Sequence, residues 1–162
     1  MSWSLDLIRT KTNTEPYGKE KDEDVIPFKK DEVIKILFEI SEIIDICIEE
    51  SGIVTVEDIE IDLDSFFIVH VYGKNWSVEL CFYNWCTYSE KDMTYDTIEL
   101  QVRGNTEPKE FLSLLSEKLS ARLFDMSAGT FWTCDGSGFS DWKSLCDRIA
   151  KELSNTKGDF YV

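Results

Sequence analysis

Apolar and polar residues alternate along several stretches of this chain, with the two-residue period that predicts β-strands. In residues 3–10, for example, Trp3, Leu5 and Leu7 share one face. A short turn at 73–75 favours an antiparallel connection between the strands on either side of it. The pattern predicts strands at 3–10, 54–63, 66–72, 76–83 and 97–103, and a strand, a turn and a strand within RLFDMSAGTFWT at 122–133.

Three other stretches repeat their apolar residues every three to four positions, which is typical of amphipathic helices. The first spans Lys30 to Glu50, and the second has Thr106 as its expected N-cap. The third places Trp142, Leu145, Ile149 and Leu153 on one stripe. We therefore expect helices at roughly 31–50, 107–122 and 140–153, and a polar surface loop without periodicity at about 11–28.

Together these elements predict one α+β domain over residues 1–162. We expect a mainly antiparallel sheet of about five or six strands, with the three helices packed chiefly on one face. A chain of this length buries roughly 70% of its extended surface, which is enough for a core without covalent cross-links. The five cysteines are odd in number and form no C-x-x-C pair, so they indicate reduced thiols in a cytoplasmic protein. The start MSWSLDLIRT is unlike a secretion signal, and no apolar run approaches the length needed to span a membrane.

The formal net charge of −15 argues against nucleic acid as a partner, because nucleic-acid modules need clustered Lys and Arg to displace counterions. The charge is also uneven along the chain. Residues 15–64 hold 17 acids and 5 bases, whereas residues 65–162 hold 14 acids and 10 bases. Such asymmetry bears on the choice of partner and on association rates more than on the fold.

The most acidic stretch is VTVEDIEIDLDSFF at 54–67. If it forms one strand, Asp58, Glu60, Asp62 and Asp64 stand in a row at roughly 7 Å spacing, opposite the face that carries the aliphatic residues. A solvated sheet face explains such a row most simply. A basic protein partner explains it together with the acids of the neighbouring segments, because a surface of one sign attracts an oppositely charged protein. We predict these four residues as partner-binding.

Aromatic residues gather in the segment NWCTYSEKDMTYD at 84–96, where no periodicity demands burial. Aromatic side chains in such a loop anchor protein interfaces well. Trp85 and Tyr88 are therefore predicted as partner-binding residues, with plain packing as the equal alternative.

Candidate catalytic chemistry is scarce. His70 is the sole histidine and lies in an apolar strand, which favours a structural role over that of a catalytic base. The DGSG segment lacks the setting of a nucleophile elbow or a phosphate-binding loop. The acidic row has oxygen donors that suit calcium or magnesium but no calcium-loop spacing. We predict no catalytic residue, no metal and no cofactor; a carboxylate-based metal-dependent enzyme or metal-binding domain stays as the alternative, and a carboxylate pair of a glycoside hydrolase is not excluded.

The small acidic α+β layout, the N-terminal SWSLDLIRTKTNTEP and the later ARLFDMSAGTFW resemble bacterial immunity proteins of contact-dependent growth inhibition and other polymorphic toxin systems. The resemblance is one of class and layout, without a shared diagnostic motif. It implies a cytoplasmic protein that is not an enzyme and that binds and neutralises a cognate basic toxin domain, often a nuclease. An adaptor with another partner shares the same features, and the sequence leaves the oligomeric state open.

Overall fold

The structure is a computed structural model in which three helices accompany a seven-stranded antiparallel sheet. The strand order in this sheet is β11-β10-β1-β9-β7-β6-β3. Every neighbouring pair in it is antiparallel, which confirms the predicted α+β class with slightly more strands than expected. The residues described are 1–12, 22–50, 53–56, 58–62, 67–83, 94–135 and 137–156.

The centre of the sheet is formed by β1 (Trp3–Ile8), β9 (Thr97–Gly104) and β7 (Trp76–Tyr83). Their register follows from the alternation in the sequence: Leu100 pairs with Leu5 on one side and with Leu80 on the other. All three leucines are fully buried. Because side chains alternate along a strand, this register places the apolar residues of three strands on one face.

The remaining strands of this sheet extend it on both sides. On one side lie β6 (Phe67–Gly73) and the edge strand β3 (Asp45–Glu50). On the other side lie β10 (Arg122–Asp125) and the two-residue edge strand β11 (Thr130–Phe131), which confirms the predicted strand, turn and strand.

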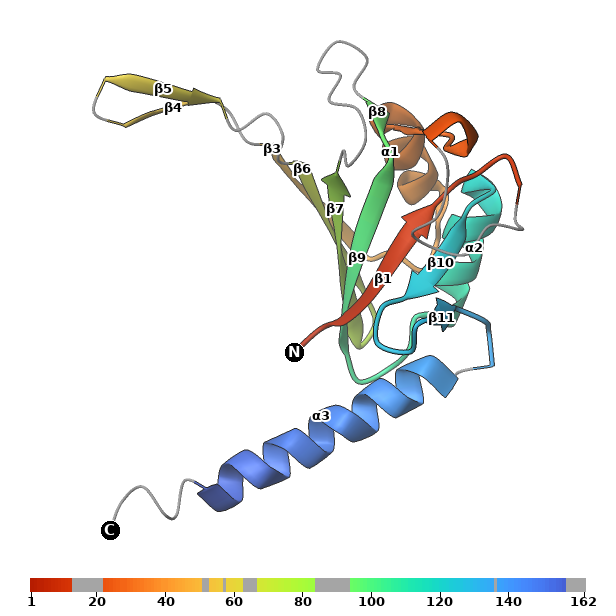
Figure 1. The fold of residues 1–162 in the computed structure, drawn as a ribbon, viewed down its shortest axis with the longest axis vertical. Helices are drawn as coiled ribbons and strands as arrows, with labels where there is room; N and C mark the ends of the chain where they lie inside the picture. Colours follow the sequence, from red (N-terminus) through yellow and green to blue (C-terminus); the bar gives the residue numbers. More distant parts are fainter. Residues whose placement is uncertain are drawn as a thin grey trace.

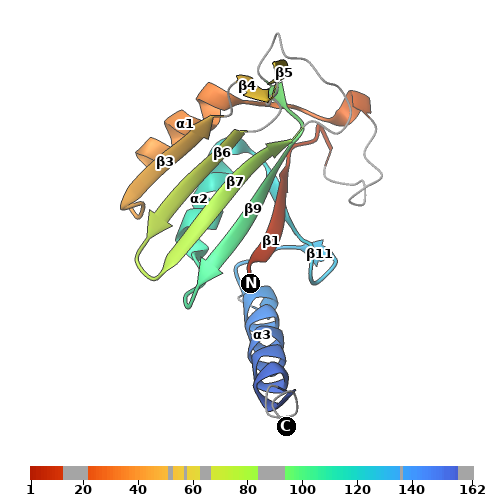
Figure 2. The ribbon, with the colours of Figure 1, turned by 90° about the vertical axis from the view of Figure 1, so that its left-hand side faces the viewer.

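Helices α1 (Lys30–Glu39) and α2 (Lys109–Leu119) cover one face of the sheet (Figure 1). Turned by 90°, the opposite face is seen without a helix over it (Figure 2). The helix residues that enter the core are Val33, Leu37, Phe111, Leu112, Leu115 and Leu119. Helix α2 is shorter than predicted, since Pro108 lies at its N-cap position and Ser120 ends it in a left-handed conformation with φ 51°.

The long helix predicted from Lys30 to Glu50 is wrong. The first ten residues form α1, and residues 45–50 form β3. Isoleucines at positions 44, 46 and 48 alternate with polar residues and cysteine, so this stretch fits the period of a strand as well as that of a helix. β-Branched residues favour the pleated surface, and Ile46 and Ile48 pair with Val71 and Val69 of β6.

The strand predicted at 54–63 is also not continuous. It is a hairpin of β4 (Ile53–Val56) and β5 (Ile59–Asp62), which form a two-stranded sheet of their own. Val56 pairs with Ile59, and Asp58 in the connection has φ 62°. A two-residue hairpin connection requires positive φ, and aspartate adopts it more readily than most residues. The hairpin lies at one end of the main sheet (Figure 1).

The segment predicted as a polar loop at 11–28 contains the 3-10 helix η1 (Asp22–Asp24), and residues 13–21 are outside the described part. It ends at β2 (Phe28–Lys29), which pairs with β8 (Thr94–Tyr95) in a second two-stranded sheet. The loop is attached to the end of β1, since the amide of Lys11 donates to the carbonyl of Asp24 at 2.8 Å and that of Ile26 donates to the carbonyl of Arg9 at 2.8 Å.

Helix α3 (Ser137–Thr156) is longer than predicted and only its beginning reaches the core. Near its start, the Asp135 carboxylate accepts hydrogen bonds from the amide of Ser137 at 3.0 Å and from its hydroxyl at 2.8 Å. These hydrogen bonds hold the pKa of Asp135 below its usual value. From there the helix projects away from the sheet, as the blue ribbon of Figure 1 shows.

Candidate functional site

The residues predicted to bind a partner do not form the expected row. Asp58 is exposed in the connection between β4 and β5, whereas Glu60 and Asp62 lie in β5, opposite Thr55 and Ile53. The single strand face proposed for all four acids is therefore wrong, because the chain reverses at Asp58. Asp64, Trp85 and Tyr88 lie outside the described residues.

The structure instead identifies the uncovered face of the main sheet as a polar surface. The strands β3, β6, β7, β9 and β1 lie side by side on the face opposite α1 and α2 (Figure 2). Their register arranges the outward positions of neighbouring strands in cross-strand rows. In one row Cys47, His70, Glu79 and Gln101 lie opposite one another on β3, β6, β7 and β9. We call this surface the open face.

Ion pairs connect the strands across the open face. His70 Nε2 lies 3.3 Å from Glu49 Oε1, and His70 Nδ1 lies 3.7 Å from Glu79 Oε1. Glu79 Oε1 also lies 2.8 Å from Arg103 Nη1. Four strands, β3, β6, β7 and β9, are thereby connected by one chain of ionisable side chains.

Hydrogen bonds continue this chain along β9. Arg103 Nη2 donates to Gln101 Oε1 at 3.2 Å, and Gln101 Nε2 donates to Glu99 Oε1 at 3.2 Å. The three residues are two positions apart along one strand, so they share a face. The open face is thus a fixed arrangement of side chains.

Carboxylates outnumber cations among the described residues at outward positions of the open face. Arg103 of β9 and Arg122 of β10 are the two arginines there, and His70 adds charge only when it is protonated. Five outward positions carry carboxylates: Asp45, Glu49, Glu79 and Glu99 are exposed or half-buried, and Asp6 is buried. The surface therefore has an acidic character even without the hairpin acids.

The geometry around His70 is that of an ion-pair chain. Each ring nitrogen lies within 3.7 Å of a carboxylate oxygen, although Nε2 has no hydrogen-bond partner of suitable angle. Cys47 is the cross-strand neighbour of His70 and is exposed. A general base for this thiol needs a ring nitrogen directed at the sulfur. Both ring nitrogens lie beside carboxylates, and the structural role expected for His70 stays a prediction.

Within the described part of the chain, no group of three or more His, Cys, Asp or Glu side chains is arranged to hold a metal ion. The same described residues contain no helix with the length and hydrophobicity needed to cross a bilayer.

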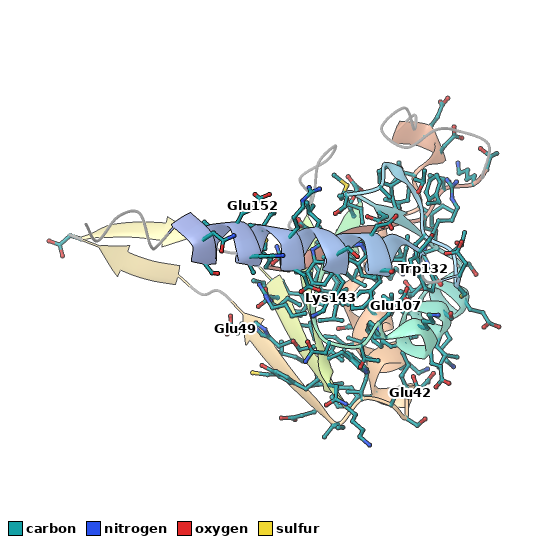
Figure 3. The ribbon with its side chains drawn as sticks, turned by 90° about the horizontal axis from the view of Figure 1, so that it is seen from below. Glu42, Glu49, Glu107, Trp132, Lys143 and Glu152 are labelled. Carbon is teal, nitrogen blue, oxygen red and sulfur yellow. The ribbon has the colours of Figure 1, made fainter. Side chains whose placement is uncertain are left out.

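The open face and the hairpin lie on the same side of the molecule. In Figure 1 the β4–β5 hairpin and the far half of α3 both project to the left of the sheet, at its opposite ends, and Figure 3 shows the same arrangement from below. Figure 3 also places Glu49 on β3, apart from Glu107, Trp132 and Lys143 near the start of α3. The acidic segment singled out in the sequence thus borders the open face.

The open-face residues were missed in the sequence for a specific reason. Alternation in the segments of β7 and β9 predicts an apolar face that holds Leu80 and Leu100, which leaves Glu79 and Glu99 on the opposite side, whereas His70 is expected within an apolar strand. Glu49, however, falls within the helix predicted at 31–50, so its place opposite β6 could not be predicted. A period-two reading of residues 44–50 is the signal that would have placed it there.

The fold and this surface define the chain as an α+β protein with one sheet face covered by α1 and α2 and an acidic opposite face over which the described residues place no helix. No protein-family model, curated protein or solved structure matches it. Its function is therefore argued from its own surface.

Proposed function

We propose that this is an immunity-type protein that binds a cognate basic toxin domain through its acidic surface and neutralises it in the cytoplasm. The observation that carries the proposal is the open face. It presents an excess of carboxylates on neighbouring strands, held by the ion pairs around His70 and Arg103. A surface of one sign accelerates association with a partner of the opposite sign and disfavours partners of like charge.

The position of the hairpin supports the same proposal. The acids at Asp58, Glu60 and Asp62 belong to a segment that projects beside the open face (Figure 1). A partner bound to the open face therefore lies near the acids of the sheet and near those of the hairpin. A basic toxin domain that normally binds nucleic-acid phosphates presents the matching positive charge.

The test is to purify the toxin domain encoded beside this gene and to measure its binding to this protein by titration calorimetry at low and high salt. We expect one-to-one binding that weakens as salt rises, because exposed charges are screened. Substituting Glu49→Gln and Glu99→Gln together should lower affinity at low salt far more than at high salt. The hairpin set Asp58→Asn, Glu60→Gln and Asp62→Asn is tested in the same way.

The matched control removes the same amount of charge from the helix-covered side. Asp31 of α1 and Glu117 of α2 are exposed there, and Asp31→Asn with Glu117→Gln should leave the affinity unchanged. Equal losses of affinity in the open-face variant and the control would show that net charge alone causes the effect. Unchanged affinity in both acidic sets would refute the proposed surface.

A further inference from the structure

Helix α3 is firmly attached to the domain at its start. The rings of Phe139 and Trp3 pack edge to face with centroids 5.5 Å apart, and Trp142 packs against Phe139 at 5.5 Å. A side chain at Gly138 would collide with the carboxylate of the buried Asp125, so helix and strand β10 approach closely here. Lys143 Nζ also donates to Asn105 Oδ1 at 3.0 Å. The direction of the helix is therefore set by packing at its first two turns.

Beyond these turns the apolar stripe of α3 continues without cover from the rest of the described chain. Leu145 is 41% exposed and Leu153 is 59% exposed, with the half-buried Ile149 between them. These three residues follow Trp142 on the same side of the helix, at spacings of three and four residues. An apolar stripe of this kind on a projecting helix needs an occupant that buries it.

The charge of α3 points to the kind of occupant. The helix carries three acids, at positions 141, 147 and 152, and three bases, at positions 143, 148 and 151. It is thus neutral within a chain of formal net charge −15. A neutral helix does not attract a basic partner. Two copies of this acidic chain can therefore associate through α3 without strong repulsion between the two helices.

The edge of the stripe has the charge pattern of a self-complementary pair. Arg148 and Glu152 are four residues apart, so they lie on the same edge of the stripe. In an antiparallel pair related by a two-fold axis at Ile149, that edge faces the same edge of the second copy. Arg148 then lies about two residues, or ~3 Å along the helix axis, from Glu152 of the second copy. The two-fold symmetry makes this contact occur twice.

We propose that two copies of this chain associate through antiparallel pairing of their α3 helices. In this pair Leu145 of one copy packs against Leu153 of the other, and the two Ile149 side chains meet at the two-fold axis. This inference is independent of the proposed function, because it uses neither the open face nor the hairpin. The stripe is short, so we expect a weak, concentration-dependent dimer.

The test is analytical ultracentrifugation of the full chain over concentrations up to the millimolar range. We expect a monomer–dimer equilibrium that shifts toward dimer as added salt screens the repulsion between the acidic domains. Ile149→Glu and the exposed Leu153→Glu should each shift it to monomer. Ser144→Glu, on the far side of the same helix, should leave it unchanged, and circular dichroism checks that every variant is folded.

A mixing experiment tests the antiparallel geometry itself. Arg148→Glu and Glu152→Arg should each weaken self-association, because each places like charges along the contact. Mixed in equal amounts, the two variants should form heterodimers, since every contact across the interface again joins opposite charges. A monomer at all concentrations, or equal effects of Ile149→Glu and Ser144→Glu, would overturn the proposal. Heterodimers no stronger than the variant homodimers would overturn the antiparallel register.

Discussion

Arg9 joins four parts of the fold that are distant in the sequence, and its removal should destabilise all of them together. Its Nη1 donates to Glu32 Oε1 of α1 at 3.0 Å and to the carbonyl of Leu119, at the end of α2, at 3.1 Å. Its Nη2 donates to the carbonyl of Pro27 at 2.8 Å, and its guanidinium lies 4.7 Å from the centre of the Phe28 ring. The side chain is 13% exposed. Arg9→Ala deletes every one of these contacts.

The expected loss follows from the partners of the guanidinium. Hydrogen bonds to a charged group contribute about 1.5–3 kcal/mol each when they are sheltered, and the cation–π contact adds about 0.5–1 kcal/mol. The Glu32 carboxylate is 36% exposed, so its share is smaller, roughly 1 kcal/mol or less. We expect Arg9→Ala to lower the free energy of unfolding by about 3–5 kcal/mol. Arg9→Lys should lose about half as much, because an ammonium cannot donate in a planar fork.

Denaturant unfolding at neutral and acidic pH separates the two kinds of contact. Arg9 holds the pKa of Glu32 below its usual value, first through the hydrogen bond. A lowered pKa in the folded state means that this share of stability is present above the normal carboxyl pKa and is lost as pH falls through the lowered value. The destabilisation by Glu32→Gln should therefore vanish in acid, whereas most of that by Arg9→Ala should persist. A loss below about 1 kcal/mol for Arg9→Ala at neutral pH would contradict the additive estimate.

Three further predictions concern a carboxyl pair, a strand end and the core. Glu42 shares a hydrogen bond with Glu110, which raises the pKa of Glu42. The stabilising contribution of the bound proton exists below the normal carboxyl pKa and is lost as pH rises through the raised value. Glu42→Gln should therefore raise the free energy of unfolding in thermal unfolding at neutral pH, by roughly a few tenths of a kcal/mol, and leave it unchanged in acid. Gly104 has φ 121°, and a Cβ there would collide with the carbonyl of Asn75, so Gly104→Ala should cost about 3 kcal/mol in thermal unfolding, whereas a neutral effect would contradict this turn geometry. Leu100→Ala opens a cavity at the centre of the sheet and should cost about 3–4 kcal/mol in chemical denaturation; a loss under about 1 kcal/mol would mean that β9 is not central.

The sequence specified the central strands well because two independent patterns agree there. Alternation in β1, β7 and β9 identifies both the strands and their buried faces, and the short Gly73–Trp76 turn fixes the β6–β7 pairing. The strand pair in RLFDMSAGTFWT was equally predictable from its turn residues. In these segments no second period competes with the first.

The errors arose where one local pattern fits two structures. Residues 44–50 satisfy both a helical and a strand period, and pairing with β6 decides between them. The acids at 58–64 seemed to continue one strand, although Asp58 is also a good residue for a tight turn. The contacts of Arg9 with Glu32 and Leu119 join residues 23 and 110 positions apart, so local periodicity could not reveal them.

The edge strand β3 has a consequence for the behaviour of the protein at high concentration. It is six residues long, whereas the opposite edge, β11, has two residues, and among the described residues β3 pairs with β6 alone. An exposed strand of isoleucines is a template for aggregation, and charged residues on an edge are a common protection against it. If the β3 strands of two copies paired, Asp45 and Glu49 would bring negative charges from both copies close together. We therefore expect the carboxylates of this edge to disfavour extension of the sheet by the β3 strand of a second copy.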